Sequence, residues 1–173
     1  EGRLIGTPNV HEDERFERAD YPLHAIAAEE YGGFTFVNLA PDPEPLSVAL
    51  RASVETITDF ERYRLDELRI GARIVYEVKA NWKIVVENYN ECLHCPGVHP
   101  ELNALSDYRS GEEVDGEGSW CGGSMTLNED AETMGTGDGH ATGRPPIRGL
   151  TETDVNSVYY FALFPNALIS LHP

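Results

Sequence analysis

The sequence has 173 residues, of which 40% are hydrophobic and 25% charged, a composition that suits one globular domain. Its 30 acidic residues against 13 basic ones give a formal net charge of -17, which disfavours nucleic acid and anionic membrane surfaces as partners. No apolar run approaches the roughly 20 residues of a membrane-spanning helix, and no signal-peptide pattern opens the chain. With only 3 cysteines, the sequence predicts a cytoplasmic protein without a disulfide scaffold.

The first 63 residues predict a linker, a strand and a helix. Residues 1–22 are polar and contain two prolines, which is typical of an extended connection. Residues 31–41 join two glycines to an aromatic and β-branched run that ends at a proline, so we expect a strand there. Between residues 41 and 63, apolar side chains recur every three or four positions behind several prolines, which predicts an amphipathic helix.

The middle of the chain predicts a strand followed by the helix that carries the chemistry. Residues 68–82 alternate apolar and polar side chains, as a half-buried antiparallel strand does. From Trp82, which we expect to anchor the core, the apolar period becomes that of a helix. We expect this helix to continue until Pro96 and Gly97 end it.

The last third of the chain predicts a long loop and two strands. Residues 110–149 are rich in glycine and show no sustained period, which favours a loop that covers another part of the molecule. Residues 158–164 and 167–172 are strand-like runs joined by a turn at Pro165 and Asn166. Together these elements predict an α+β fold, a mostly antiparallel sheet with helices on one face.

Glu91, His94 and His99 form the candidate metal site. Residues three apart share one face of a helix, so Glu91 can lie beside the imidazole of His94. A continuous helix would turn His99 roughly 140° away from His94, and we expect a bend at Pro96 and Gly97 to bring it back. Two imidazoles suit Fe(II), Zn(II) or Cu(II), and one further carboxylate would complete a facial triad with open positions. Glu91 would orient His94 from behind.

The run from Asn81 to Pro100 resembles the most specific motif in the catalytic domain of Rieske non-haem iron oxygenase α subunits. In that family an acidic residue, two spacers, His, four spacers and His mark the iron site, and Glu91, His94 and His99 repeat this spacing. EGRLIGTP resembles the end of a Rieske domain, while ADYPL and EEYGGFTFVNLAPD resemble the entry into the catalytic domain. The motif ECLHCPGVHP looks closest to the branch that demethylates or hydroxylates quaternary ammonium compounds.

The resemblance implies a helix-grip, Bet v1-like catalytic domain that is truncated at both ends. Residues 1–22 would be the linker from a Rieske domain that this sequence lacks, and residues 23–173 a partial catalytic domain. His94 and His99 would bind a mononuclear Fe(II), with a third ligand, an Asp, beyond Pro173. The residues around the aspartates of this chain do not match the family segment that carries the third ligand. These aspartates are Asp107, Asp130, Asp138 and Asp154.

The resemblance also implies how the site works. Electrons from a [2Fe-2S] Rieske cluster in a neighbouring subunit of a homotrimer would pass through Glu91 to the mononuclear iron. Asn88, one turn earlier, is a further candidate beside this path. A ferredoxin or reductase would supply the electrons, and Fe(II) and O2 would hydroxylate or oxidatively demethylate a small organic substrate. The isolated chain is expected to be inactive.

Several features of the sequence allow a second interpretation. Cys92 and Cys95 form a CxxC pair that fits a redox dithiol or half a zinc site, but we expect them to pack as small apolar residues. The domain would also suit a non-catalytic helix-grip module that encloses an apolar ligand. His140 fits a loop residue, and His172 a pocket residue or a strand end. The apolar residues Phe161, Phe164 and Leu168 fit either the wall of a pocket or the hydrophobic core.

Overall fold

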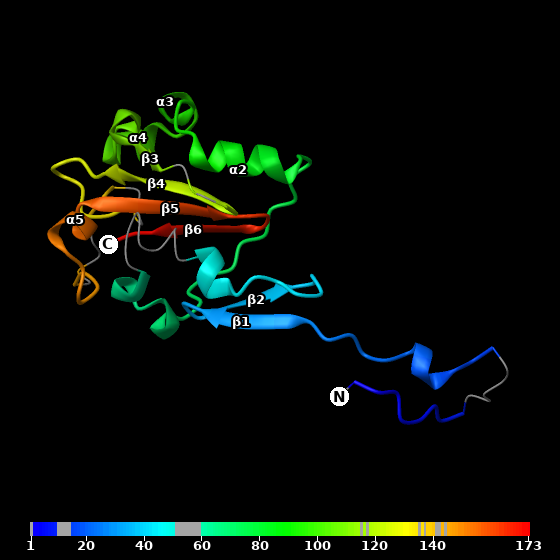
Figure 1. Ribbon diagram of the computed structural model, residues 1–173. Coiled ribbons are helices and arrows are strands. Elements are labelled where there is room, and N and C mark those ends of the chain that lie inside the picture. The colour runs from blue at the N-terminus through cyan, green and yellow to red at the C-terminus, as the bar shows by residue number, and fades with distance from the viewer. Residues whose placement is uncertain are drawn as a thin grey trace.

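The structure of the chain is a computed structural model, and it describes residues 2–9, 15–50, 60–114, 116, 118–134, 136, 138–140, 143 and 145–173. Its centre is an antiparallel sheet in the order β3-β4-β5-β6, shown in Figure 1. The strands are β3 (Glu112–Val114), β4 (Trp120–Thr126), β5 (Ser157–Leu163) and β6 (Ala167–Leu171). The predicted α+β class with a mostly antiparallel sheet is confirmed.

The C-terminal hairpin of β5 and β6 forms where the sequence predicts it. β5 pairs along its whole length with β4, and all but one of its residues are buried. Its other edge pairs with β6, and a turn over 164–166 joins the two strands. The predicted turn at Pro165 and Asn166 is therefore confirmed.

The loop predicted over 110–149 is wrong where β3 and β4 form. β4 contains Gly122 and Gly123, and a Cβ atom on either would collide with the carbonyl oxygen of a neighbouring strand, Tyr160 in β5 or Glu112 in β3. The side-chain-free positions allow the three strands to approach this closely. The glycines that favoured a loop in the sequence are thus part of the sheet.

A separate hairpin precedes the main sheet. It consists of β1 (Ala27–Tyr31) and β2 (Phe34–Asn38), which pair in an antiparallel register. Gly32 and Gly33 form the two-residue turn with φ of 57° and 78°, the positive angles that a tight hairpin turn of matching twist requires. The strand predicted within 31–41 is confirmed, and β1 is an additional strand that the sequence analysis missed.

The hydrophobic core lies between the sheet and the segment that follows this hairpin. The residues at 46–50 are helical, as the helix predicted over 41–63 requires, and residues 51–59 lie outside the described part of the chain. The 3-10 helices η2 (Phe60–Tyr63) and η3 (Leu65–Glu67) come next. Phe60 packs edge-on against Phe161 at 4.6 Å between ring centroids, and Phe161 is fully buried. Phe161 is therefore core and not a pocket wall.

Three helices lie on the opposite side of the sheet from the β1–β2 hairpin, as Figure 1 shows. They are α2 (Trp82–Asn90), α3 (Cys95–Val98) and α4 (Pro100–Leu105). The Asn81 side chain caps α2 by accepting a hydrogen bond from the backbone N–H of Lys83 at 3.0 Å. Trp82 is 45% exposed at the start of α2, so its predicted role as a core anchor is wrong.

The strand predicted over 68–82 is wrong. Residues 68–79 connect η3 to α2 and pair with no strand in the described part of the chain. Side chains of both faces are exposed, with Ile74 at 70% and Val75 at 75%. Alternation gives a segment two distinct faces, but a strand also needs a neighbour that satisfies its backbone hydrogen bonds, and no described segment lies there.

A buried carboxylate fastens the short helix α5 (Glu152–Val155) to the core. Asp154 is 1% exposed, and its side chain forms a capping box with Thr151. The same carboxylate accepts hydrogen bonds from the Arg62 guanidinium at 2.9 Å and from the Tyr159 hydroxyl at 3.1 Å. α5, η2 and β5 are thereby joined through one side chain.

The N-terminal residues form an arm that extends away from the sheet (Figure 1). It contains one 3-10 helix, η1 (Arg18–Asp20), and most of its side chains are exposed. Its assignment as an interdomain linker, residues 1–22, stays a prediction. No helix in the described ranges is both long and apolar enough to cross a membrane.

Candidate metal centre

Residues 91–99, the ligand turn, carry the candidate ligands, and this turn begins earlier than the sequence predicts. α2 ends at Asn90, and Glu91 has an extended backbone with φ -107° and ψ 138°. Pro96 and Gly97 lie inside α3 instead of bending the chain, because a proline in the first turn of a helix needs no N–H donor. The predicted kink at these two residues is wrong, and the break in the helix lies between Asn90 and α3.

The two histidines nevertheless come together. His94 and His99 flank α3 on either side, so a single helical turn separates them. The centroids of their rings are 5.4 Å apart, and the ring planes meet at 73°. The predicted approach of the two imidazoles is thus present, while metal binding by them stays a prediction.

Glu91 holds His94 by two contacts. Its carboxylate accepts a hydrogen bond from the His94 backbone N–H at 3.0 Å, and its other oxygen lies 3.0 Å from Nδ1 of the His94 ring. The contact with the His94 side chain lowers the pKa of the Glu91 carboxyl. A ring whose Nδ1–H is directed to a carboxylate presents Nε2 to a metal, so Glu91 is placed to orient His94 although the two do not share a helix.

A third protein ligand is not found in the described ranges, which contain no group of three or more His, Cys, Asp or Glu side chains that could hold a metal ion. Two aspartates considered above have structural partners: Asp107 pairs with Arg109 at 2.7 Å, and Asp154 pairs with Arg62. The two imidazoles fit two of the three protein positions of a facial triad, and these aspartates stay outside the ligand set.

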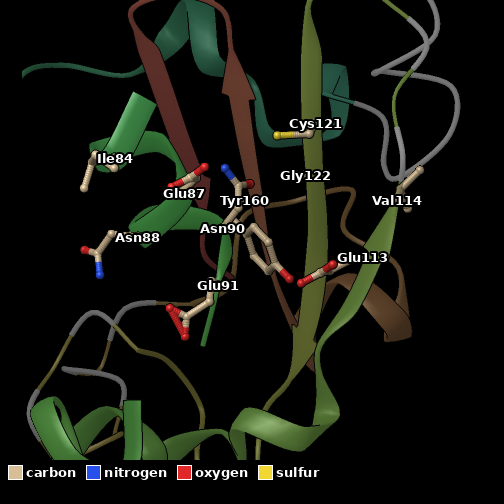
Figure 2. A pocket seen from close by; sticks show the side chains of 10 residues that line it. All are labelled: Ile84, Glu87, Asn88, Asn90, Glu91, Glu113, Val114, Cys121, Gly122 and Tyr160. Carbon is tan, nitrogen blue, oxygen red and sulfur yellow. The ribbon is translucent and has the colours of Figure 1, made fainter. Parts of the chain in front are cut away.

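A cleft of about 640 Å³ lies beside the turn, between α2 and the sheet. Figure 2 shows its lining, which comes from α2, the residue after it, and strands β3, β4 and β5: Ile84, Glu87, Asn88, Asn90, Glu91, Glu113, Val114, Cys121, Gly122 and Tyr160. Asn88 is exposed on α2 and its side chain points away from Tyr160 (Figure 2). Its predicted role beside the electron path stays a prediction.

The cleft is acidic and has one aromatic wall. Glu87, Glu91 and Glu113 contribute carboxylates, and the Tyr160 hydroxyl points toward Glu113 in Figure 2. Burial, and secondarily the charge of Glu113, raises the pKa of Tyr160 to about 12, so this phenol stays protonated at neutral pH. The sequence analysis missed Tyr160 and Glu113. The alternation of side chains along β5 could have indicated Tyr160, because Tyr159 faces the core and the next residue must face the other side of the sheet.

The cysteines of the CxxC pair are bonded to each other. Cys92 and Cys95 form a disulfide with their Cα atoms 5.1 Å apart, so the expectation that they pack as separate apolar residues is wrong. The chain reverses within this turn, where the Cys95 backbone N–H donates to the Cys92 carbonyl at 3.0 Å. Cys95 is 3% exposed, whereas Cys92 is half-buried.

Other candidate residues lie apart from the ligand turn. His140 is an exposed loop residue, as predicted, and its backbone N–H donates to the Asp138 side chain at 3.2 Å. His172 follows β6, where burial lowers the pKa of its imidazole. Phe164 and Leu168 are 38% and 39% exposed, so neither is core; Phe164 lines a separate cavity of about 520 Å³ beside the β1–β2 hairpin, and Leu168 lines neither cavity.

Comparison with protein families gives one match, over residues 65–173, to the ring hydroxylating alpha subunit (catalytic domain). A glycine betaine monooxygenase oxygenase subunit from Chromohalobacter salexigens is 38% identical over 111 residues, which cover 62% of this chain and 24% of that protein. A carnitine monooxygenase oxygenase subunit from Acinetobacter baumannii is 32% identical over 100 residues, which cover 58% of this chain and 27% of that protein. The chain thus spans about a quarter of the length of these relatives.

Solved structures share the fold. The quaternary ammonium Rieske monooxygenase CntA in complex with an inhibitor superposes with a TM-score of 0.66 at 21% identity, over 99% of this chain and 41% of that one. A second structure, described as revealing insights into carnitine oxidation and inter-subunit electron transfer, gives 0.65 at 19% identity, over 99% and 42% of the respective chains. At this identity the likeness concerns the arrangement of the elements.

Proposed function

Because this chain belongs to the ring-hydroxylating α-subunit family, by its catalytic domain, we propose that it is part of a Rieske-type oxygenase that acts on a quaternary ammonium compound. The observation that carries the proposal is the pair of imidazoles, His94 and His99, 5.4 Å apart beside a carboxylate that holds one of them. In this proposal they are two of the protein ligands of a mononuclear Fe(II). Bound there, iron would supply the reductive activation of O2.

The chain's own residues prepare this site. In this proposal Glu91 would hold the proton of His94 on Nδ1, which would leave Nε2 to bind the metal. The same carboxylate is 41% exposed at its side chain, which leaves it accessible to a group from another subunit. We infer that Glu91 would lie on the path of electrons from a [2Fe-2S] cluster, which a neighbouring subunit of a homotrimer would hold and a ferredoxin or reductase would reduce.

The acidic cleft beside Glu91 favours a cationic compound, and its lining includes neither His94 nor His99. Three carboxylates, those of Glu87, Glu91 and Glu113, line it and attract positive charge, and Tyr160 adds an aromatic ring to the lining, the kind of group that contacts ammonium ions. The formal net charge of -17 acts in the same direction at longer range. We therefore favour hydroxylation or oxidative demethylation of a quaternary ammonium compound, carried out in the cytoplasm.

Oxygen uptake by the full-length protein, with its cluster and donor, tests the proposal. We expect uptake with glycine betaine or carnitine and far less with an uncharged isostere in which carbon replaces the quaternary nitrogen. Equal rates with the isostere would contradict the cationic substrate. An iron-loaded protein that binds the ammonium compound without consuming O2 would instead favour the non-catalytic ligand-binding module.

Removing the charge of Glu91 should impair turnover more than iron binding. In the full-length Glu91→Gln variant we expect turnover about 10–100-fold lower, because an amide does not fix the His94 tautomer or favour electron entry as a carboxylate does. Steady-state oxygen uptake and iron content per chain measure the two effects. Glu101→Gln, the same change on exposed α4, is the matched control, and an equal loss there would show that Glu91 has no special role.

The isolated 173-residue chain is expected to hold iron weakly and to show no oxygen-dependent turnover. In the described part of the chain no carboxylate completes a metal site with the two imidazoles, and two imidazoles alone provide neither the charge nor the geometry of a facial triad. Iron per chain after desalting is the measurement, by mass spectrometry of the metal. A stoichiometric complex that survives desalting would mean that the chain completes the site by itself.

A further inference from the structure

We propose that Cys92 and Cys95 are a reversible thiol oxidation site whose disulfide tightens the ligand turn around His94; the effect on iron rests on the function proposed above. The two sulfurs are bonded, and the Cα separation of 5.1 Å lies within the range of protein disulfides. The bond encloses only Leu93 and His94 between its two ends. One of the two candidate ligands is thus inside the covalent ring.

The turn is connected to both histidines through the backbone. The Cys95 N–H donates to the Cys92 carbonyl at 3.0 Å, and the His99 N–H donates to the Cys95 carbonyl at 2.8 Å. The His94 carbonyl accepts from the Val98 N–H at 2.9 Å. A bond between the cysteines therefore restricts the turn that sets how His94 and His99 face each other, and a pair of ligands held in place before binding loses less freedom when the metal arrives.

The two cysteines differ in their exposure, and this difference predicts which sulfur reacts first. Cys92 lines a cavity of about 220 Å³, which shares Asn90, Glu91, Glu113 and Tyr160 with the larger cleft. Cys95 is 3% exposed. A small thiol or peroxide that enters the cavity meets Cys92 first, so Cys92 is the sulfur that is attacked and Cys95 the leaving sulfur. In a reducing compartment such an accessible disulfide is expected to be transient.

The chemistry of the exchange is simple. In the oxidising direction, hydrogen peroxide takes up two electrons and the two thiol protons, the bond between Cys92 and Cys95 forms, and two molecules of water are released. In the reducing direction, two glutathione thiols supply the electrons and protons and leave as glutathione disulfide. No other reactant is required.

Differential alkylation with mass spectrometry of the full-length protein tests the site directly. After peroxide we expect the peptide that contains Cys92 and Cys95 to resist alkylation, and after glutathione we expect both cysteines to be labelled. Labelling of both cysteines that is insensitive to peroxide would overturn the proposal. This readout does not depend on iron, so it stands even if the proposed function fails.

The effect on the metal is measured as the rate at which Fe(II) passes to a ferrous chelator, with the visible absorption of the cluster as an internal check. We expect release roughly 3–10-fold faster from the reduced protein and from the Cys92→Ser/Cys95→Ser variant than from the oxidised protein. When the protein is treated with peroxide before Fe(II) is loaded, and the peroxide is removed first, the treatment should slow later release from the parent protein and have no effect on the double variant. Equal rates in the oxidised and reduced parent would refute the tightening of the turn, and a protein without iron in either state would refute the proposed function instead.

Discussion

Under the proposed function, replacing both His94 and His99 by alanine should remove the mononuclear iron from the full-length protein while the fold and the Rieske cluster persist. The centroids of the two rings are 5.4 Å apart, and under the proposed function each ring would supply one nitrogen ligand to the iron. We expect the iron affinity of the double variant to fall by more than about 100-fold, beyond the loss typical of groups that only orient a ligand. Oxygen-dependent turnover should disappear with the iron.

The fold should tolerate these two changes. His99 is exposed and the His94 ring is 21% exposed, so neither substitution opens a core cavity, and we expect a change in stability within about 1 kcal/mol. His140→Ala, in an exposed loop, is the matched control for metal analysis and thermal unfolding. Iron content that stays at the parent level in the double variant would reject these histidines as ligands.

The largest effect on stability is expected from Asp154→Asn. The carboxylate is buried and accepts hydrogen bonds from Thr151, Arg62 and Tyr159, so one substitution weakens the contact among α5, η2 and β5. Hydrogen bonds to a charged acceptor contribute more than neutral ones, and we expect a loss of about 2–3 kcal/mol in the free energy of unfolding. Urea unfolding followed by circular dichroism is the measurement.

The contribution of Asp154 should depend on pH in a defined direction. Burial by itself raises the pKa of this carboxyl, but hydrogen bonds from the Thr151 backbone and the Arg62 guanidinium outweigh it and lower that pKa from 3.8 to about 2. A lowered pKa stabilises the folded state above the unfolded value and ceases to do so as the pH falls through the folded value. The difference between parent and variant should therefore be constant above about pH 5 and shrink as the pH falls from about 5 to 2.

An exposed ion pair provides the control for this experiment. Glu67→Gln removes the contact of Glu67 with Arg64, in which both side chains are about half exposed, and it should leave the unfolding midpoint nearly unchanged. An equal loss of stability in both variants would show that the buried position of Asp154 is not the cause. A parent-to-variant difference that does not vary with pH would contradict the lowered pKa.

Much of the local structure and the candidate ligands could be predicted from residue order. The β5 and β6 runs, the turn at Pro165 and helix α2 follow from side-chain period and turn chemistry, which act over a few neighbouring residues. The candidate site of Glu91, His94 and His99 could also be proposed from the sequence, because the three residues lie within one short segment that resembles the family's motif; metal binding by the two histidines stays a prediction. Such features need no knowledge of distant contacts.

Tertiary contacts decided the remaining features. Gly122 and Gly123 belong to a strand because β3 and β5 approach on both sides, whereas residues 68–79 alternate correctly and still form none, because no described segment pairs with them. The chain breaks after Asn90 and not at Pro96, which no period reveals, and that break places Cys92 against Cys95. The burial of Asp154 likewise depends on partners far away in the sequence. Backbone pairing and burial are satisfied between distant segments, so they appear only when the chain is folded.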